Sequence, residues 1–177
     1  MRIIRGSHRG RLIHPPNNLP VRPTTDLAKE SLFNILENNF FLQDLSVLDL
    51  FSGTGSISYE FASRGSKLVV AVESNTRCSR FITDTAKQLN FTALRTMRVN
   101  AFSFLKQSSQ KFDIIFADPP YDLEGIELIP QLVFERKLLV EDGWLVVEHS
   151  REKAFKEHPG FFDQRKYGKV NFSFFKQ

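Results

Sequence analysis

The chain has 177 residues, of which 41% are hydrophobic and 25% are charged, and this composition excludes a disordered chain and allows one domain with a sizeable core. The single cysteine, Cys78, excludes an internal disulfide and a multi-cysteine zinc site. No run approaches the roughly 20 apolar residues that span a bilayer, and the N-terminus lacks the apolar stretch of a secretory signal. We therefore expect a cytoplasmic protein with no metal site and no membrane partner.

The positive charge is concentrated near the N-terminus. The net charge is +4, and residues 1–25 contain five arginines but no lysine, aspartate or glutamate. A nearly neutral body that carries one basic segment suggests a polyanionic partner such as a nucleic acid. A solvated tail is the alternative interpretation of the same charges.

The first predicted element is a small N-terminal β-hairpin extension that carries this charge. Residues 2–5 and 11–13 predict two short strands around a turn framed by Gly6 and Gly10, and the prolines that follow predict a stiff connector. We therefore divide the chain into a basic arm and connector over residues 1–22 and an α/β domain over residues 23–177. Apolar residues at helical spacing predict that the domain opens with a helix from Thr25-Asp26 to Asn38-Asn39.

From residue 46 onward, strands alternate with helices. Apolar runs predict strands at 47–51, 67–72, 96–99, 112–117 and 144–147. The helices between them are predicted to end near residue 65, to span 75–89, to pass through 102–105, and to span 126–134 with an interruption at Pro130. Residues 161–165 and 170–175 predict a closing hairpin. The pattern predicts an α/β fold with a mainly parallel sheet, helices on both faces and an antiparallel C-terminal edge hairpin.

Ligands of an open parallel sheet bind outside the carboxyl ends of its strands. In this chain those ends are residues 49–55, Glu73, Asn100, residues 118–121 and residues 148–149. We expect these five segments to surround one crevice.

The loop Asp49-Leu50-Phe51-Ser52-Gly53-Thr54-Gly55 has two glycines that permit a tight turn and close approach of a ligand to the backbone. It only partly matches a dinucleotide fingerprint, because Ser58 stands at the third glycine position. Asp49 would repel a pyrophosphate but could pair with an ammonium or sulfonium ligand. Glu73, after the next strand, is placed to accept hydrogen bonds from ribose hydroxyls. The alternatives are an ordinary strand-to-helix turn for the loop and a solvated acid before a helix for Glu73.

Asp118-Pro119-Pro120-Tyr121 directly follows an apolar strand. Two prolines stiffen the turn, and Tyr121 offers a flat face on which a base could stack. The Asp118 carboxylate and the Pro119 carbonyl could accept both N–H groups of an exocyclic amine and orient it toward a methyl donor. An ordinary Pro-Pro turn is the alternative, but in this context the pattern favours an amino-methyltransferase.

The 49–55 loop followed by residues 118–121 resembles the class I amino-methyltransferases that use S-adenosylmethionine. The resemblance extends to the N-terminal region of the RsmD-type 16S ribosomal RNA guanine-N2 methyltransferases, and it covers nearly the whole chain. The segments that carry it are Arg2-Ile3-Ile4-Arg5-Gly6, Arg9-Gly10-Arg11, Arg22-Pro23-Thr24-Thr25-Asp26 and Leu32-Phe33-Asn34-Ile35-Leu36. It implies a Rossmann-like fold, S-adenosylmethionine as cofactor, and a guanine N2 amine of 16S rRNA as acceptor, in a small ribosomal subunit or an assembly intermediate. The chain's size fits a monomer.

The resemblance also implies roles for particular residues. The cofactor would be held by Asp49, Phe51, Ser52, Gly53, Thr54, Gly55, Glu73, Ser74, Asn100 and Ala101. The catalytic residues that hold the target guanine would be Asp118, Pro119, Pro120 and Tyr121. RNA would be bound by Arg2, Arg5, Arg9, Arg11, Arg22, Thr24 and Thr25. Many class I sites carry aspartate where this chain has Asn100, whose amide oxygen can still accept a hydrogen bond from the adenine amine.

Other functions stay open on the residues alone. An adenine-N6 or other amino-methyltransferase acting on RNA or DNA would share the 118–121 motif. A catalytically inactive RNA-binding module could keep the same fold, and a nicotinamide dehydrogenase is the least favoured because the third glycine is missing. His149 and Cys78 are interpreted as packing residues, although His149 lies near the expected crevice.

Overall fold

The computed structural model describes residues 1–17, 19, 25–150 and 155–176. Its helices are α1 (Asp26–Glu37), α2 (Ser56–Ser63), α3 (Thr76–Gln88), α4 (Ala101–Gln107) and α5 (Leu128–Glu135), with a 3-10 turn η1 (Leu42–Asp44). Its strands are β1 (Ser46–Leu50), β2 (Leu68–Val72), β3 (Leu94–Met97), β4 (Phe112–Ala117), β5 (Leu139–His149), β6 (Phe161–Tyr167) and β7 (Val170–Lys176).

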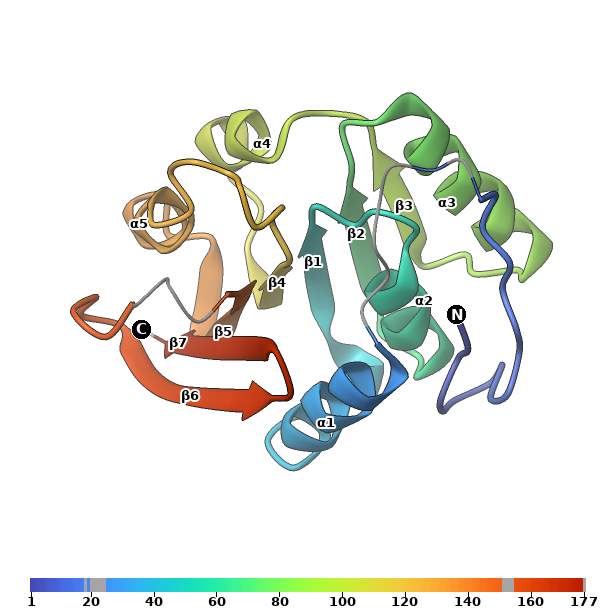
Figure 1. Ribbon diagram of the computed structural model, residues 1–177, viewed down its shortest axis with the longest axis horizontal. Coiled ribbons are helices and arrows are strands. Elements are labelled where there is room, and N and C mark those ends of the chain that lie inside the picture. The colour runs from blue at the N-terminus through green and yellow to red at the C-terminus, as the bar shows by residue number, and fades with distance from the viewer. Residues whose placement is uncertain (18, 20–24, 151–154, 177) are drawn as a thin grey trace.

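In the described part of the chain, the strands form one seven-stranded sheet in the order β3-β2-β1-β4-β5-β7-β6 (Figure 1). The first five of these strands are parallel, whereas β7 runs antiparallel to both β5 and β6. The chain order reverses between β1 and β4, and such a switch point is where ligands bind in open α/β sheets. The predicted α/β fold with an antiparallel edge hairpin is confirmed.

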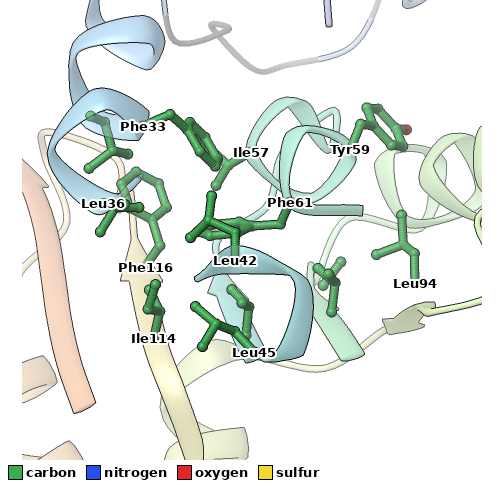
Figure 2. Close-up of a cluster of buried hydrophobic side chains, with 14 of the residues drawn as sticks. Phe33, Leu36, Leu42, Leu45, Ile57, Tyr59, Phe61, Leu94, Ile114 and Phe116 are labelled. Atoms are coloured by element: carbon green, nitrogen blue, oxygen red, sulfur yellow. The ribbon is translucent and has the colours of Figure 1, made fainter. Parts of the chain in front are cut away.

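Two apolar clusters cover the two faces of the sheet. The first packs α1, α2 and α3 against one face, and Figure 2 shows Phe33 of α1, Phe61 of α2 and Phe116 of β4 among its side chains. The centroids of the Phe33 and Phe61 rings lie 4.6 Å apart. The second cluster packs α4 and α5 on the opposite face through residues such as Leu105 and Val133. Because β1, β2 and β4 are covered on both sides, their sequences are mostly apolar and show no regular alternation with polar residues.

The N-terminal arm is packed against the body beside α2 and α3 (Figure 1). Its two limbs pair antiparallel at Arg2 and Leu12 and exchange backbone hydrogen bonds of 2.8–3.0 Å, so the predicted hairpin forms, although its paired segments are shorter than the predicted strands. Ile3 and Ile13 are buried in the first apolar cluster. Their burial fixes the arm to the body, so the arm does not depend on backbone hydrogen bonds alone. A Cβ atom on Gly6 would lie 1.9 Å from the carbonyl oxygen of Ser63, so this turn requires glycine.

A buried carboxylate on α2 joins the arm to the two neighbouring helices. Glu60 accepts hydrogen bonds from the backbone N–H groups of Ile4 and Arg5 at 2.9 and 3.0 Å. Its carboxylate also pairs with Arg64 at 2.7 Å and lies 3.7 Å from the ammonium of Lys29 on α1. Burial lowers the pKa of Lys29, and the charge of Glu60 opposes that shift. The sequence did not reveal this network, because its members lie far apart along the chain.

Several predicted boundaries were wrong. Strand β3 lies two residues earlier than predicted, because pairing with β2 sets its register. Strand β5 begins at Leu139 rather than at residue 144, because the turn-like residues 141–143 form an irregularity within the strand. Pro130 does not interrupt α5, since it occupies the first turn, where its missing N–H has no helical partner. The 3-10 turn η1 was not predicted.

Candidate active site

The carboxyl ends of the parallel strands meet at one edge of the sheet. Leu50 of β1 pairs with Val72 of β2 on one side and with Ala117 of β4 on the other. Ala117 also pairs with Val147 of β5, and the Asp118 amide donates to the Leu50 carbonyl at 3.4 Å. The predicted glycine loop, Glu73 and the 118–121 run therefore leave the sheet side by side.

The glycine loop is a tight turn that is closed by its own hydrogen bonds. Gly55 donates its N–H to the Ser52 carbonyl at 2.7 Å, and the Ser52 hydroxyl donates to the Asp49 carbonyl at 2.7 Å. Gly53 and Gly55 have φ values of 55° and 85°, and a Cβ on Gly55 would lie 2.8 Å from the Tyr59 ring. Both glycines are needed for this path, so the loop could serve as either a turn or a ligand cradle on geometry alone.

The surroundings of Asp49 favour the ligand-cradle interpretation. It is 1% exposed and accepts a hydrogen bond from the Ser58 hydroxyl. Burial raises the pKa of Asp49 from 3.8 to about 7, although the hydrogen bonds from Ser58 and Ser52 oppose that rise. A buried carboxylate without a cation is costly, and a cationic ligand bound beside the loop would remove that cost. Asp49 therefore fits the ammonium or sulfonium of S-adenosylmethionine.

Glu73, directly after β2, braces the glycine loop. It is 8% exposed and accepts the N–H of Gly53 at 2.8 Å and the N–H of Asn75 at 2.7 Å. Each carboxylate oxygen can accept more than one hydrogen bond, so ribose hydroxyls can still be bound. The alternative of a merely solvated acid does not describe this side chain. Ser74, its neighbour, is exposed.

The candidate adenine side lies at the start of α4. Asn100 is the N-cap of this helix, and its side-chain oxygen accepts the N–H of Ser103 at 3.2 Å. Ala101 is buried behind it. The half-buried ring of Phe51 lies edge-to-face with Phe102, with centroids 6.1 Å apart. The cap occupies one lone pair of the Asn100 oxygen, so the other is the one that an adenine amine would use.

The 118–121 run is a turn with a graded exposure. Asp118 is half-buried, Pro119 is buried, and Pro120 and Tyr121 are exposed. Leu123 donates its N–H to the Pro120 carbonyl at 2.9 Å and closes the turn. Tyr121 is 51% exposed at this edge of the sheet. This arrangement suits a planar acceptor that stacks on the tyrosine and reaches the Asp118 carboxylate.

The arginines of the arm differ in their surroundings. Arg5 pairs with Glu37 of α1 at 2.8 Å, and Arg2 lies 3.7 Å from Asp26. Arg9 and Arg11 are exposed. Thr25 is the N-cap of α1 and accepts the N–H of Ala28 at 3.3 Å, which confirms the predicted helix start. Two further predicted RNA-binding residues, Arg22 and Thr24, lie outside the described residues.

The matches to known proteins agree with this geometry. The family model described as Conserved hypothetical protein 95 matches residues 1–176. The Bacillus subtilis protein YlbH is 34% identical over 90% of this chain and 88% of its own length. The ribosomal RNA small subunit methyltransferase D of Escherichia coli K12 is 31% identical over 90% of this chain and 79% of its own length. The chain belongs to the family that this model and these relatives define. The resemblance to the RsmD-type enzymes is thereby confirmed.

Solved structures related to this methyltransferase family show the same fold. The structure of Escherichia coli yhhF superposes with a TM-score of 0.88 at 26% identity, covering 100% of this chain and 98% of that chain. A Thermus thermophilus 16S rRNA N2 G1207 methyltransferase in complex with AdoMet and guanosine has a TM-score of 0.71 at 18% identity, over 90% of this chain and 45% of that chain. The class I, Rossmann-like fold is therefore established for this member of the family.

Other features of this family member bear on its chemistry. Among the described residues, no three His, Cys, Asp or Glu side chains are grouped to hold a metal ion, and no helix has the length and apolar character to cross a membrane. His149 is buried, with its two ring nitrogens 2.7 Å from the Ser150 carbonyl and 2.8 Å from the Ser173 hydroxyl. Burial lowers its pKa, so the packing role predicted for it fits its surroundings. Cys78 is also buried.

Proposed function

We propose that this chain is an S-adenosylmethionine-dependent methyltransferase that acts on the exocyclic N2 amine of a guanine in 16S ribosomal RNA. One observation carries the proposal most directly. The pairing of Leu50 with Ala117 sets the acidic glycine loop beside the Asp118–Tyr121 turn, so that a donor and an acceptor bound at these two loops would be neighbours. Its relatives include a ribosomal RNA small subunit methyltransferase, which supports rRNA as the substrate.

The residues at the first three strand ends form the donor site. Asp49 and the 51–55 loop would hold the methionine part, Glu73 and Ser74 the ribose, and Asn100 and Ala101 the adenine. When it is bound, S-adenosylmethionine supplies a methyl group that is already activated by a sulfonium. The chain therefore needs chiefly to position the acceptor, and positioning alone can lower a barrier by about 7–11 kcal/mol in favourable cases.

Positioning of the acceptor is the task of residues 118–121. The guanine amine is a poor nucleophile, because its lone pair is delocalised into the ring. Asp118 and the Pro119 carbonyl accept its two N–H groups, which orients the amine, while Tyr121 stacks on the base. The proton released after transfer passes to water and needs no dedicated base.

The exposed arginines of the arm would contact RNA phosphates, which position an enzyme without reading sequence. Arg9 and Arg11 suit this role best, since Arg2 and Arg5 are engaged with carboxylates of α1. In the same proposal, Arg22, Thr24 and Thr25 also bind RNA. The substrate is a small ribosomal subunit or an assembly intermediate, and the enzyme acts on it as a monomer in the cytoplasm.

Nucleoside analysis tests the proposed function. Purified protein is incubated with methyl-labelled S-adenosylmethionine and small subunits from cells that lack this enzyme, and the digested rRNA is separated by chromatography. Label in N2-methylguanosine is expected. Label in N6-methyladenosine would show that the acceptor is adenine, and failure to bind S-adenosylmethionine in calorimetry would refute the enzymatic function.

A further inference from the structure

A second carboxylate, that of Glu148, lies at the carboxyl end of β5, next to the turn that would hold the acceptor. It has no part in the function described so far. Glu148 is the penultimate residue of β5 and is 3% exposed. Among the described residues, its Oε2 atom is buried without any hydrogen-bond partner. An unpaired buried carboxylate oxygen costs stability and usually has a functional reason.

The sheet register places Glu148 next to Asp118. Ala117 of β4 pairs with Val147 of β5, so the residues that follow each of them are neighbours on adjacent strands, about 4.8 Å apart. Phe116 and Val146 both lie in the first apolar cluster, whereas Ala117 and Val147 lie in the second. Because side chains alternate along a strand, Glu148 is on the same face as Val146, the face that carries Phe116 on β4.

We propose that Glu148 recognises the N1–H group of the target guanine and so selects guanine over adenine. This inference rests on the proposed function. Guanine presents its N1–H beside its N2 amine on one edge, so a base whose amine reaches Asp118 would offer the N1–H to the neighbouring carboxylate. The bound base would supply the donor that Glu148 Oε2 lacks.

Adenine cannot make this contact. Its N1 atom carries a lone pair in place of a hydrogen, and that lone pair would face a carboxylate oxygen. A site built around a substrate N–H rejects analogues that lack it, because the buried polar group of the site is then left unpaired. Burial raises the pKa of Glu148 to about 7, and the N1–H donor would favour the ionised form that accepts it.

The test replaces the target guanine by 2-aminopurine, which keeps the 2-amine but has no N1–H. Small subunits are reconstituted with 16S rRNA that carries either base at the methylated position, after that position has been mapped with the wild-type protein. Single-turnover methylation by the wild type is expected to be about 10–100-fold slower on 2-aminopurine, the factor expected for a hydrogen bond to a charged group. The amide of Glu148→Gln can donate to the bare N1, so this variant should lose most of the preference.

The comparison between proteins isolates the recognition step. Any difference in intrinsic reactivity between the two bases is the same for both proteins and cancels in the ratio. Glu141→Gln, an exposed position on the same strand, should keep the wild-type ratio. An unchanged ratio in Glu148→Gln would overturn the proposal. If that variant does not fold, Glu148→Met takes its place, and a wild-type ratio in Glu148→Met would equally overturn the proposal. Absence of any guanine methylation would instead refute the proposed function.

Discussion

Replacement of Asp49 by asparagine should stabilise the protein without its cofactor. The side chain is buried, and its pKa is raised from 3.8 to about 7. Because folding favours the protonated form of this carboxyl, its contribution to stability is fully present below about pH 4. The contribution is lost as the pH rises through about 7, where the carboxyl must ionise in the folded protein. Relative to low pH, burial of Asp49 therefore lowers the free energy of unfolding by about 4 kcal/mol at pH 8.5, where the buried group is ionised. At pH 5, where the buried group is protonated, the loss is only about 2 kcal/mol. Asparagine removes the charge and can still accept the hydrogen bond of Ser58.

Urea unfolding at pH 5 and pH 8.5 measures this difference. The free energy of unfolding of Asp49→Asn should exceed that of the wild type at both values, by about 2 kcal/mol more at pH 8.5 than at pH 5. At the higher pH the melting temperature should rise by roughly 8–16 °C, since 1 kcal/mol corresponds to about 2–4 °C in a domain of this size. Asp44→Asn, an exposed position, controls for removal of one negative charge.

The same substitution should weaken the cofactor site. S-adenosylmethionine would lose its buried counter-charge, and its affinity in calorimetry should fall at least about tenfold. The stabilised variant would then be a poor enzyme, because a buried charge that serves function often lowers stability. A stability gain that does not change with pH would refute the burial argument, and unchanged cofactor affinity would refute the pairing role.

Three other substitutions test the rest of the site. Asp118→Ala should abolish turnover while leaving S-adenosylmethionine binding within a few-fold of the wild type, and strong residual methylation would count against its orienting role. Gly55→Ala should destabilise the fold by about 1–3 kcal/mol in urea unfolding, because it combines a φ of 85° with a close contact to the Tyr59 ring; unchanged stability would contradict the turn argument. Neutralising Arg9 and Arg11 together should weaken rRNA binding and lower the slope of log affinity against log salt by about two, and an unchanged slope would show that the arm does not contact phosphates.

Much of the fold could be predicted where local patterns are strong. Strand β4 was predicted at residues 112–117 with its observed ends, because a mostly apolar run follows Lys111 and ends at Asp118 before a double proline. The start of α1 was also predicted, because Thr25 caps it through a local hydrogen bond. The first half of β5 was not predicted, since Asp142-Gly143 is typical of a turn and only pairing with β4 keeps it in the sheet.

Sequence motifs alone were enough to predict the class of the protein and the residues of a candidate site. The glycine loop, Glu73 and the double-proline turn each lie at the end of one predicted strand, so each can be recognised from local sequence. How distant segments meet followed instead from packing and strand pairing. Packing set Glu60 of α2 beneath the arm and paired two of the arginines with acids, and strand pairing brought Glu148 beside Asp118, with one oxygen that no described residue hydrogen-bonds. Such pairings depend on sheet register and helix packing, which join residues that no local pattern relates.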